Sequence, residues 1–302
     1  MWKDFTFPYV DEVVPLVLTD NYLLDCLNCC YQYLWNKTYS IGFCTHYNYS
    51  AFIGNYLLWL TNCKERIAYS YKAEQQYINE DFRLEQYKDF NYDLLLTQPY
   101  INPSELIHEV DRKLYLLGDV NNKSLFLPTH SKSENNVIVG LGASSKYKQY
   151  PANKLIKTLY KIKEPIILVG TDLQSADYIS RKINCINLVG RTTLPQLIEV
   201  IQSGKLVITG DTSFIHIASA LNKKIIVISS ESKKKSEENP GIFSSYYRFR
   251  PYQGEYIYLR PNKQLNDCQY IQKLGYCCHN EPYCITQIDY KEIIEAYERL
   301  VI

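Results

Sequence analysis

The sequence predicts an α/β protein, because short apolar segments alternate with helical segments throughout its second half. Strands that are buried on both faces of a parallel sheet are short, continuous apolar runs, and residues 166–170, 206–208 and 225–228 are runs of this kind. Polar turns and then apolar residues at helical spacing follow them, most clearly in residues 205–227. This alternation predicts a parallel sheet that is covered by helices on both faces.

The chain of 302 residues can bury a large core, and two domains of about 130 to 160 residues are its natural division. The polar segment 128–135 begins with a proline, so we place the linker there. We therefore expect a first domain over residues 1–130, a second over 131–288 and a terminal helix over 289–302.

The first domain contains shorter segments of the same two kinds. Residues 20–36 predict a helix. The expected inward face of this helix carries Leu23, Leu27, Cys30, Tyr31 and Leu34. The other predicted elements are strands at 40–44, 66–69 and 92–96 and helices at 50–60 and 106–117.

Composition excludes several functional classes. A net charge of +1 gives no general attraction for nucleic acid, and the basic residues are scattered apart from residues 233–235. No run of about 18 apolar residues predicts a transmembrane helix. The first residues lack the basic and apolar regions of a signal peptide, so we expect a cytoplasmic protein.

The ten cysteines predict free thiols rather than a disulfide framework in that compartment. Zinc sites usually show pairs of cysteines two to four residues apart. Cys26 and Cys29 have this spacing but lie on an apolar helical face without a second pair, and the cysteines of residues 268–284 do not have it. No Gly-x-Gly-x-x-Gly opens a helix, which disfavours a dinucleotide. We predict neither a metal nor a cofactor.

A polar turn follows the strand at 206–208. Asp211, Thr212 and Ser213 are good helix N-caps, and His216 lies one turn into the helix that follows. Ligands bind at the carboxyl ends of parallel strands, because free N–H groups and the helix dipole attract anions there. The alternative is that Asp211 and Thr212 only cap the helix and that His216 is a hydrogen-bonded interior residue.

This turn resembles the donor-site signature of family 9 glycosyltransferases, the heptosyltransferases, which reads Asp-Ser/Thr-Gly-x-x-His-x-x-Ala-Ala. The matching residues are Asp211, Thr212, His216 and Ala220, with Ser219 in place of the first alanine. Ser213 stands where the family usually has glycine, which lets a pyrophosphate approach the backbone closely. A serine hydroxyl can serve as a hydrogen-bond donor in its place.

A second turn, after the strand that begins at residue 137, resembles the family's Gly-Ala-Ser-x-x-Lys-x-Trp-Pro segment. The matching residues are Gly142, Ala143, Ser144, Ser145, Lys148 and Pro151, with Tyr150 at the tryptophan position. Serine hydroxyls and turn amides can hold a diphosphate while Lys148 neutralises its charge. A fixed cation also favours departure of the nucleoside diphosphate, whose negative charge grows in the transition state. The alternative is an ordinary turn with a surface lysine.

Asp172 follows the strand at 166–170, where an acidic residue commonly binds ribose hydroxyls, although it could equally cap the next helix. Residues 186–201 resemble the family segment that lies near the nucleoside base. The predicted donor-binding residues are Ser144, Ser145, Lys148, Asp172, Asp211, Thr212, Ser213 and His216. We assign no catalytic residue.

Beyond the two turns, residues 231–241 predict a charged loop, and residues 246–250 and 256–259 predict short extended segments. Arg248 and Arg250 could meet phosphates or an acidic acceptor, although a solvated position is more common for arginine.

The first domain resembles the family only in its later part, through residues 10–16, 63–70 and 107–118. The family's opening strand and glycine–aspartate loop, which carries its proposed catalytic base, have no counterpart. The resemblance implies the GT-B architecture, two Rossmann-like domains, here with an incomplete amino-terminal domain. It also implies that the last helix crosses back onto the first domain.

The resemblance implies a glycosyltransferase that moves a heptose or related sugar from a nucleoside-diphosphate donor such as ADP-heptose. The acceptor would be a lipopolysaccharide-type or other glycan, or a lipid-linked one. The protein would be a monomer or weak oligomer that could touch the inner face of the cell membrane. The alternative is a non-catalytic nucleotide-sugar-binding or scaffold protein, because the incomplete first domain would lack the base that deprotonates an acceptor.

Overall fold

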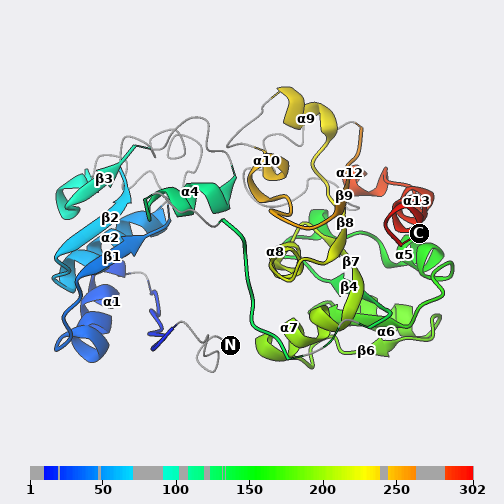
Figure 1. Ribbon diagram of the computed structural model, residues 1–302, viewed down its shortest axis with the longest axis horizontal. Coiled ribbons are helices and arrows are strands. Elements are labelled where there is room, and N and C mark those ends of the chain that lie inside the picture. The colour runs from blue at the N-terminus through cyan, green and yellow to red at the C-terminus, as the bar shows by residue number, and fades with distance from the viewer. Residues whose placement is uncertain are drawn as a thin grey trace. The chain divides into compact units, whose positions relative to one another are not determined.

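The chain forms two compact units, which we call the first unit (residues 2–123) and the second unit (residues 124–302) (Figure 1). The division falls shortly before the predicted linker at 128–135. The computed structural model describes residues 10–19, 21–46, 49–70, 91–101, 108–118, 123–130, 132, 134–238, 244–262 and 283–301.

The second unit is built on a six-stranded parallel sheet with the order β6-β5-β4-β7-β8-β9. Its strands are β4 (Asn136–Leu141), β5 (Ile166–Gly170), β6 (Ile186–Asn187), β7 (Gly204–Gly210), β8 (Lys224–Ile228) and β9 (Tyr256–Leu259). The order reverses direction between β4 and β7, and such a switch point is where open α/β sheets bind ligands.

Two sets of helices cover this sheet. One face packs against α5 (Ala152–Leu159), α6 (Leu173–Ser180) and α13 (Tyr290–Val301), and the other against α7 (Leu194–Ser203) and α8 (Ser213–Ala220). Successive residues of β4 point to opposite faces, so Val137 and Val139 join the first layer and Ile138 joins the second. The predicted parallel sheet with helices on both faces is confirmed.

The apolar stripe of α13, which we expected to cover the first domain, lies in the core of the second unit. Ile293, Ala296 and Leu300 are buried there with the side chains of α5 and α6. Lys224 Nζ donates to the carbonyl oxygen of Leu300, and Thr158 Oγ1 donates to that of Tyr290 at 3.3 Å. The last helix is therefore an integral layer of the second unit.

The described residues of the second unit also form four short helices: η4 (Lys146–Lys148), α9 (Lys233–Glu238), α10 (Ser245–Phe249) and α12 (Tyr283–Thr286). The prediction of a loop is therefore wrong over residues 233–238, while residues 239–241 lie outside the described residues. The prediction of an extended segment over 246–250 is wrong as well. The aromatic sequence of α10 favours a strand. The side chain of Ser244, which accepts a hydrogen bond from the amide of Tyr247 at 3.3 Å, caps a helix there instead.

The first unit has a smaller parallel sheet of three strands in the order β1-β2-β3. The elements within its described residues are α1 (Tyr22–Cys29), the π-helix η1 (Cys30–Leu34), β1 (Ile41–Cys44), α2 (Tyr49–Leu60), β2 (Glu65–Tyr69), the 3₁₀ helix η3 (Tyr92–Leu95), β3 (Gln98–Tyr100) and α4 (Glu109–Tyr115). The predicted strand at 92–96 is wrong. Asn91 accepts a hydrogen bond from the amide of Asp93 and begins a helical turn, and the strand follows at residue 98.

The buried face of α1 and η1 consists of cysteines, and of the residues predicted to face inward only Cys30 is buried. Cys26, Cys29 and Cys30 are buried, whereas Leu23 and Leu27 are 45% and 44% exposed. The change from α-helix to π-helix at residue 30 alters which side chains share a face. All seven described cysteines of the chain are free thiols.

Candidate functional site

The two predicted turns meet at one edge of the second sheet. β4 and β7 are adjacent and parallel, with Gly140 opposite Thr209, so the turns that follow them leave the sheet side by side. Lys148 Nζ lies 3.9 Å from Asp211 Oδ2. A side chain at Gly210 would bring its Cβ within 2.9 Å of the carbonyl oxygen of Lys148, so this close approach requires glycine.

In the turn that follows β4, which we call the β4 turn, the short helix η4 comes directly after the two serines and carries Lys148. Gly142 has a φ of +106°, a conformation that L side chains rarely adopt. Ser144 is exposed and Ser145 half-buried, and the amide of Lys148 donates to the carbonyl oxygen of Ser145 at 3.0 Å. Tyr150, at the family's tryptophan position, donates its hydroxyl to the carbonyl oxygen of Ile288 at 2.9 Å. The turn is thus fastened to the segment before α13.

In the turn that follows β7, which we call the β7 turn, no side chain caps the start of α8. Thr212 occupies the N-cap position, but its side chain makes no capping hydrogen bond and lies 3.3 Å from Thr209 Oγ1. Asp211 faces Lys148 instead of capping the helix. The alternative that these two residues only cap α8 is therefore wrong. An uncapped helix start offers free N–H groups and a positive dipole end, which together bind anions.

Asp211 and Lys148 form a loose ion pair. The side chain of Asp211 is 12% exposed and that of Lys148 is 27% exposed. Burial raises the pKa of Asp211 above its ordinary value, and the positive charge of Lys148 partly offsets this. At 3.9 Å the two charges are at the limit of an ion pair, so the ammonium group can also meet a ligand.

His216 is exposed on the second turn of α8, so the alternative of an interior histidine is wrong. The edge of its ring contacts Phe249 of α10, with the ring centres 6.3 Å apart and the planes at 73°. Ser213, one turn earlier, is also exposed. The structure therefore brings His216, Ser213 and Asp211 to the same end of α8.

Asp172 caps α6, because its Oδ1 accepts a hydrogen bond from the amide of Ser175 at 3.0 Å. It also lines a narrow pocket together with Lys148 and Thr209. The pocket's volume of about 30 Å³ has room for one or two waters, not for a nucleotide. The capping role of Asp172 is thus present, and its ribose role stays a prediction.

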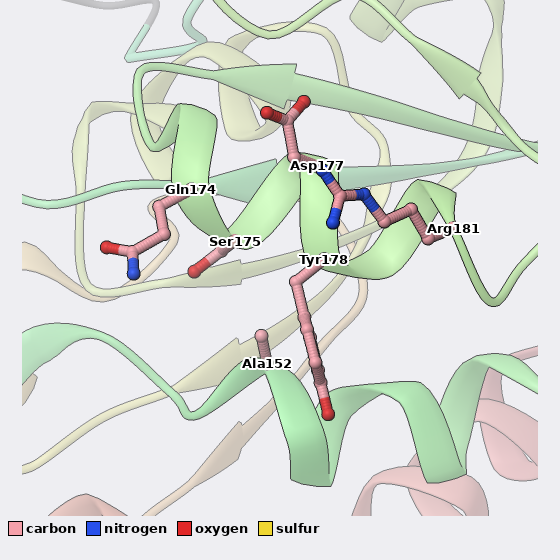
Figure 2. Close-up of a pocket in the computed structure, with 6 residues that line it drawn as sticks. All are labelled: Ala152, Gln174, Ser175, Asp177, Tyr178 and Arg181. Carbon is pink, nitrogen blue, oxygen red and sulfur yellow. The ribbon is translucent and has the colours of Figure 1, made fainter.

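A larger pocket of about 400 Å³ lies between α5 and α6. No motif in the sequence predicted this pocket. It is lined by Ala152, Gln174, Ser175, Asp177, Tyr178 and Arg181. Figure 2 shows the Tyr178 side chain pointing from α6 toward the first turn of α5. Because Ser175 lines both pockets, the larger pocket adjoins the narrow pocket at Asp172.

Sequence reasoning also missed Tyr258 on β9, next to the β7 turn. Burial, and then the negative charge of Asp211, raise its pKa well above the ordinary value. Pairing of β9 with β8 brings it there, and no local motif predicts that pairing. Among the described residues, no group of three or more His, Cys, Asp or Glu side chains is placed to hold a metal ion. Cys268, Cys277 and Cys278 lie outside the described residues.

Comparison with known proteins identifies one family. The model of glycosyltransferase family 9 (heptosyltransferase) matches residues 58–239. No curated protein sequence matches the chain. No helix within the described ranges is long and apolar enough to cross a membrane.

Solved structures share the fold. A family 9 glycosyl transferase from Veillonella parvula is 16% identical with a TM-score of 0.69, over 97% of this chain and 83% of that one. E. coli heptosyltransferase WaaC with ADP is 13% identical with a TM-score of 0.60, over 88% and 74%. E. coli ADP-heptose lps heptosyltransferase II is 16% identical with a TM-score of 0.56, over 86% and 75%. The predicted GT-B fold is confirmed.

Proposed function

The chain belongs to glycosyltransferase family 9, the heptosyltransferases, and from this membership we propose that it transfers a sugar from a nucleoside-diphosphate donor to a glycan acceptor. The observation that carries the donor assignment is the convergence of two polar turns, one with Lys148 and one with Asp211. A cation and an uncapped helix start, side by side at a switch point, suit a diphosphate.

In this proposal Lys148 and the amides at the start of α8 bind the diphosphate, and the hydroxyls of Ser144, Ser145 and Thr212 add hydrogen bonds. The carboxylate of Asp211 would repel phosphate, so we assign it to a sugar hydroxyl, from which a carboxylate accepts a hydrogen bond. Asp172 can use its second oxygen for ribose.

The groups that face the leaving diphosphate must stabilise the negative charge that develops on it during the reaction. The acceptor hydroxyl attacks the anomeric carbon while the bond from that carbon to the diphosphate oxygen breaks. The diphosphate gains negative charge as this bond breaks, and Lys148 with the α8 dipole stabilises that charge. The acceptor's proton passes to a base, and we assign no residue to that role.

Adenosine diphosphate is the first donor nucleotide to test, because the structurally similar heptosyltransferase WaaC has been solved with ADP. Isothermal calorimetry with ADP-heptose, a GDP-sugar and a UDP-sugar would rank the nucleotides. A turnover assay on the same samples separates an enzyme from a protein that only binds its donor. Failure to bind any of the three would contradict the proposal.

The decisive variant is Lys148→Ala. We expect it to weaken donor binding by about tenfold or more, equivalent to about 1.4 kcal/mol, because the diphosphate loses its fixed cation. Lys146→Ala is a matched control, since Lys146 is an exposed lysine of the same short helix. Equal losses in both variants, or none in Lys148→Ala, would place the diphosphate elsewhere.

A further inference from the structure

Three buried polar atoms at the ends of β8 and β9 have no hydrogen-bond partner in the described part of the chain. They are the hydroxyl oxygen of Tyr258, Oε1 of Glu231 and Nε of Arg260. Glu231 Oε2 accepts a hydrogen bond from the amide of Tyr246 at 2.8 Å, and Arg260 Nη1 donates to Ser236 Oγ. The hydroxyl is the only polar group of the Tyr258 side chain, so that side chain is left without any such bond.

A buried hydroxyl without a partner lowers stability, because it has given up its hydrogen bonds to water and gained none in return. Such groups are rare in folded proteins, and they occur where function requires them. Tyr258 stands outside both sequence motifs of the site. Its hydroxyl therefore calls for a functional explanation that the motifs do not supply.

The register of the sheet brings Tyr258 to the β7 turn. Thr209 of β7, Val227 of β8 and Tyr258 of β9 lie opposite one another in adjacent strands, so their side chains point to the same face. Two strand spacings separate the backbones of Thr209 and Tyr258 by about 10 Å, and a tyrosine side chain covers most of such a distance. On this face Thr209 Oγ1 lies 3.3 Å from the hydroxyl of Thr212 in the β7 turn. The phenol of Tyr258 therefore extends toward the same turn.

The hydroxyl of Tyr258 lies close to two carboxylates. Burial, and then the charge of Asp211, raise the pKa of Tyr258 well above its ordinary value, and Glu231 adds to this rise. Ser229 and Arg260 offset only part of it. The phenol thus stays protonated at physiological pH, and it is a hydrogen-bond donor beside groups that accept hydrogen bonds.

Donor binding changes the surroundings of one of these carboxylates. The side chain of Asp211 is 12% exposed, and its ion pair with Lys148 at 3.9 Å is too long for a hydrogen bond. In the proposed function Lys148 binds the diphosphate, so the cation turns away from Asp211 while negative charge arrives nearby. A buried carboxylate that loses its cation is unfavourable unless a hydrogen-bond donor compensates for the loss. Glu231 is not affected in this way, because its Oε2 keeps the hydrogen bond from Tyr246.

We propose that Tyr258 is a positioning residue of the donor site, and that its hydroxyl donates a hydrogen bond to Asp211 when Lys148 turns to the diphosphate. This inference rests on the proposed function and adds a residue to its site. A carboxylate accepts several hydrogen bonds, so Asp211 can hold the hydroxyl of Tyr258 and a sugar hydroxyl at once. The phenol then fixes the orientation in which Asp211 meets the sugar.

The test is a double-mutant cycle on nucleotide binding. Calorimetry with ADP, GDP and UDP finds the nucleotide that wild type binds most tightly, and this nucleotide is the probe for every variant. The cycle compares Tyr258→Phe, Asp211→Ala and the double variant at pH 8 and at pH 5.5. Tyr256→Phe is the matched control, since Tyr256 lies on the same strand and packs in the same layer.

The pH dependence must be separated from other titrations around the β7 turn. The other charged or titratable side chains there are the same in all of these variants, so their contributions cancel in the comparison. They are Lys148, Asp172, His216, Glu231 and Arg260. Circular dichroism and thermal melting, without nucleotide, report the fold and stability of each variant.

We expect Tyr258→Phe to weaken nucleotide binding by about fivefold or more at pH 8, because a hydrogen bond to a charged group is lost. The loss should be smaller at pH 5.5, because the complex can then protonate Asp211, and a neutral carboxyl needs no such donor. In the Asp211→Ala background no acceptor remains, so the same substitution should cost less than about twofold, as should Tyr256→Phe. The melting temperature of free Tyr258→Phe should not fall, since the hydroxyl that it removes has no partner.

Four results would overturn the inference. Equal losses with and without Asp211, at the two pH values, or in Tyr258→Phe and Tyr256→Phe would mean that the phenol acts through packing alone. A lower melting temperature of free Tyr258→Phe would mean that the hydroxyl is already hydrogen-bonded before the donor binds. Unchanged affinity in Tyr258→Phe refutes this inference and leaves the donor assignment intact. A wild-type protein that binds none of the three nucleotides refutes the donor assignment, and this inference with it.

Discussion

The central strand of the second unit and the edge strand β1 of the first unit bury their side chains differently. In β7 of the second unit, Leu206, Val207 and Ile208 are all buried, because helices cover both faces of that sheet. In β1 of the first unit exposure alternates, and Ile41 and Phe43 are 48% and 39% exposed. Among the described residues the buried apolar clusters of the first unit are also the smaller ones, so its described core is the thinner of the two. We therefore expect the unit that carries the proposed donor site to be the more stable one.

The largest expected effect is on the core beneath the site. Leu206→Ala should lower the free energy of unfolding by about 2–5 kcal/mol, because it removes a fully buried side chain between two packed layers. Urea titration followed by circular dichroism measures this loss. Leu173→Ala is the control, since Leu173 is 59% exposed and should change stability by less than about 0.5 kcal/mol. A loss below about 1 kcal/mol for Leu206→Ala would show that the double-sided core is less tightly packed than the burial indicates.

A smaller effect should come from the contacts that fasten α13 to the second unit. Burial on its own would raise the pKa of Glu164, but hydrogen bonds from Lys205 and Tyr297 outweigh it and hold the pKa below its ordinary value. A carboxyl with a lowered pKa in the folded protein stabilises the fold above its unfolded pKa, and the contribution is lost as the pH falls through the folded value.

Glu164→Gln should therefore lower the free energy of unfolding by about 1 kcal/mol at neutral pH, and the difference from wild type should shrink below about pH 4. Urea titrations at several pH values measure this. The exposed pair of Glu255 with Lys224 gives the control, because Glu255→Gln should cost less than about 0.5 kcal/mol at any pH. A difference that stays constant with pH would mean that the charge of Glu164 does not matter.

The same contrast explains which parts of the fold could be predicted from sequence. In the second unit the apolar runs are long and their turns carry specific residues, so the strands and the meeting of Lys148 with Asp211 followed from the pattern. Helix α10 was missed because its aromatic residues favour a strand. Its local cap is Ser244, and Glu231, 15 residues before Tyr246, accepts a further hydrogen bond from the amide of Tyr246. The uncapped state of Thr212 involves a local contact instead, since its Oγ1 lies 3.3 Å from that of Thr209, three residues earlier.

In the first unit the prediction failed at the level of side chains. We predicted that Leu23 and Leu27 face inward along with Cys30, but small cysteines let this helix approach α2 closely, with Cys26 Sγ 3.9 Å from the carbonyl oxygen of Ile53. Hydrophobic periodicity gives cysteine and leucine equal weight. It therefore finds such a helix without finding its buried face.

These buried cysteines provide the last test, which changes no residue. Burial raises the pKa of Cys26 to about 11, so its thiol should react with iodoacetamide at pH 8 only when the first unit opens. Cys284, which is buried in the second unit, is the internal reference. With its thinner core, the first unit should open at a lower urea concentration, and mass spectrometry should find Cys26 alkylated before Cys284. Alkylation of both at the same concentration would mean that the two units unfold together, and the contrast in burial would then have no counterpart in stability.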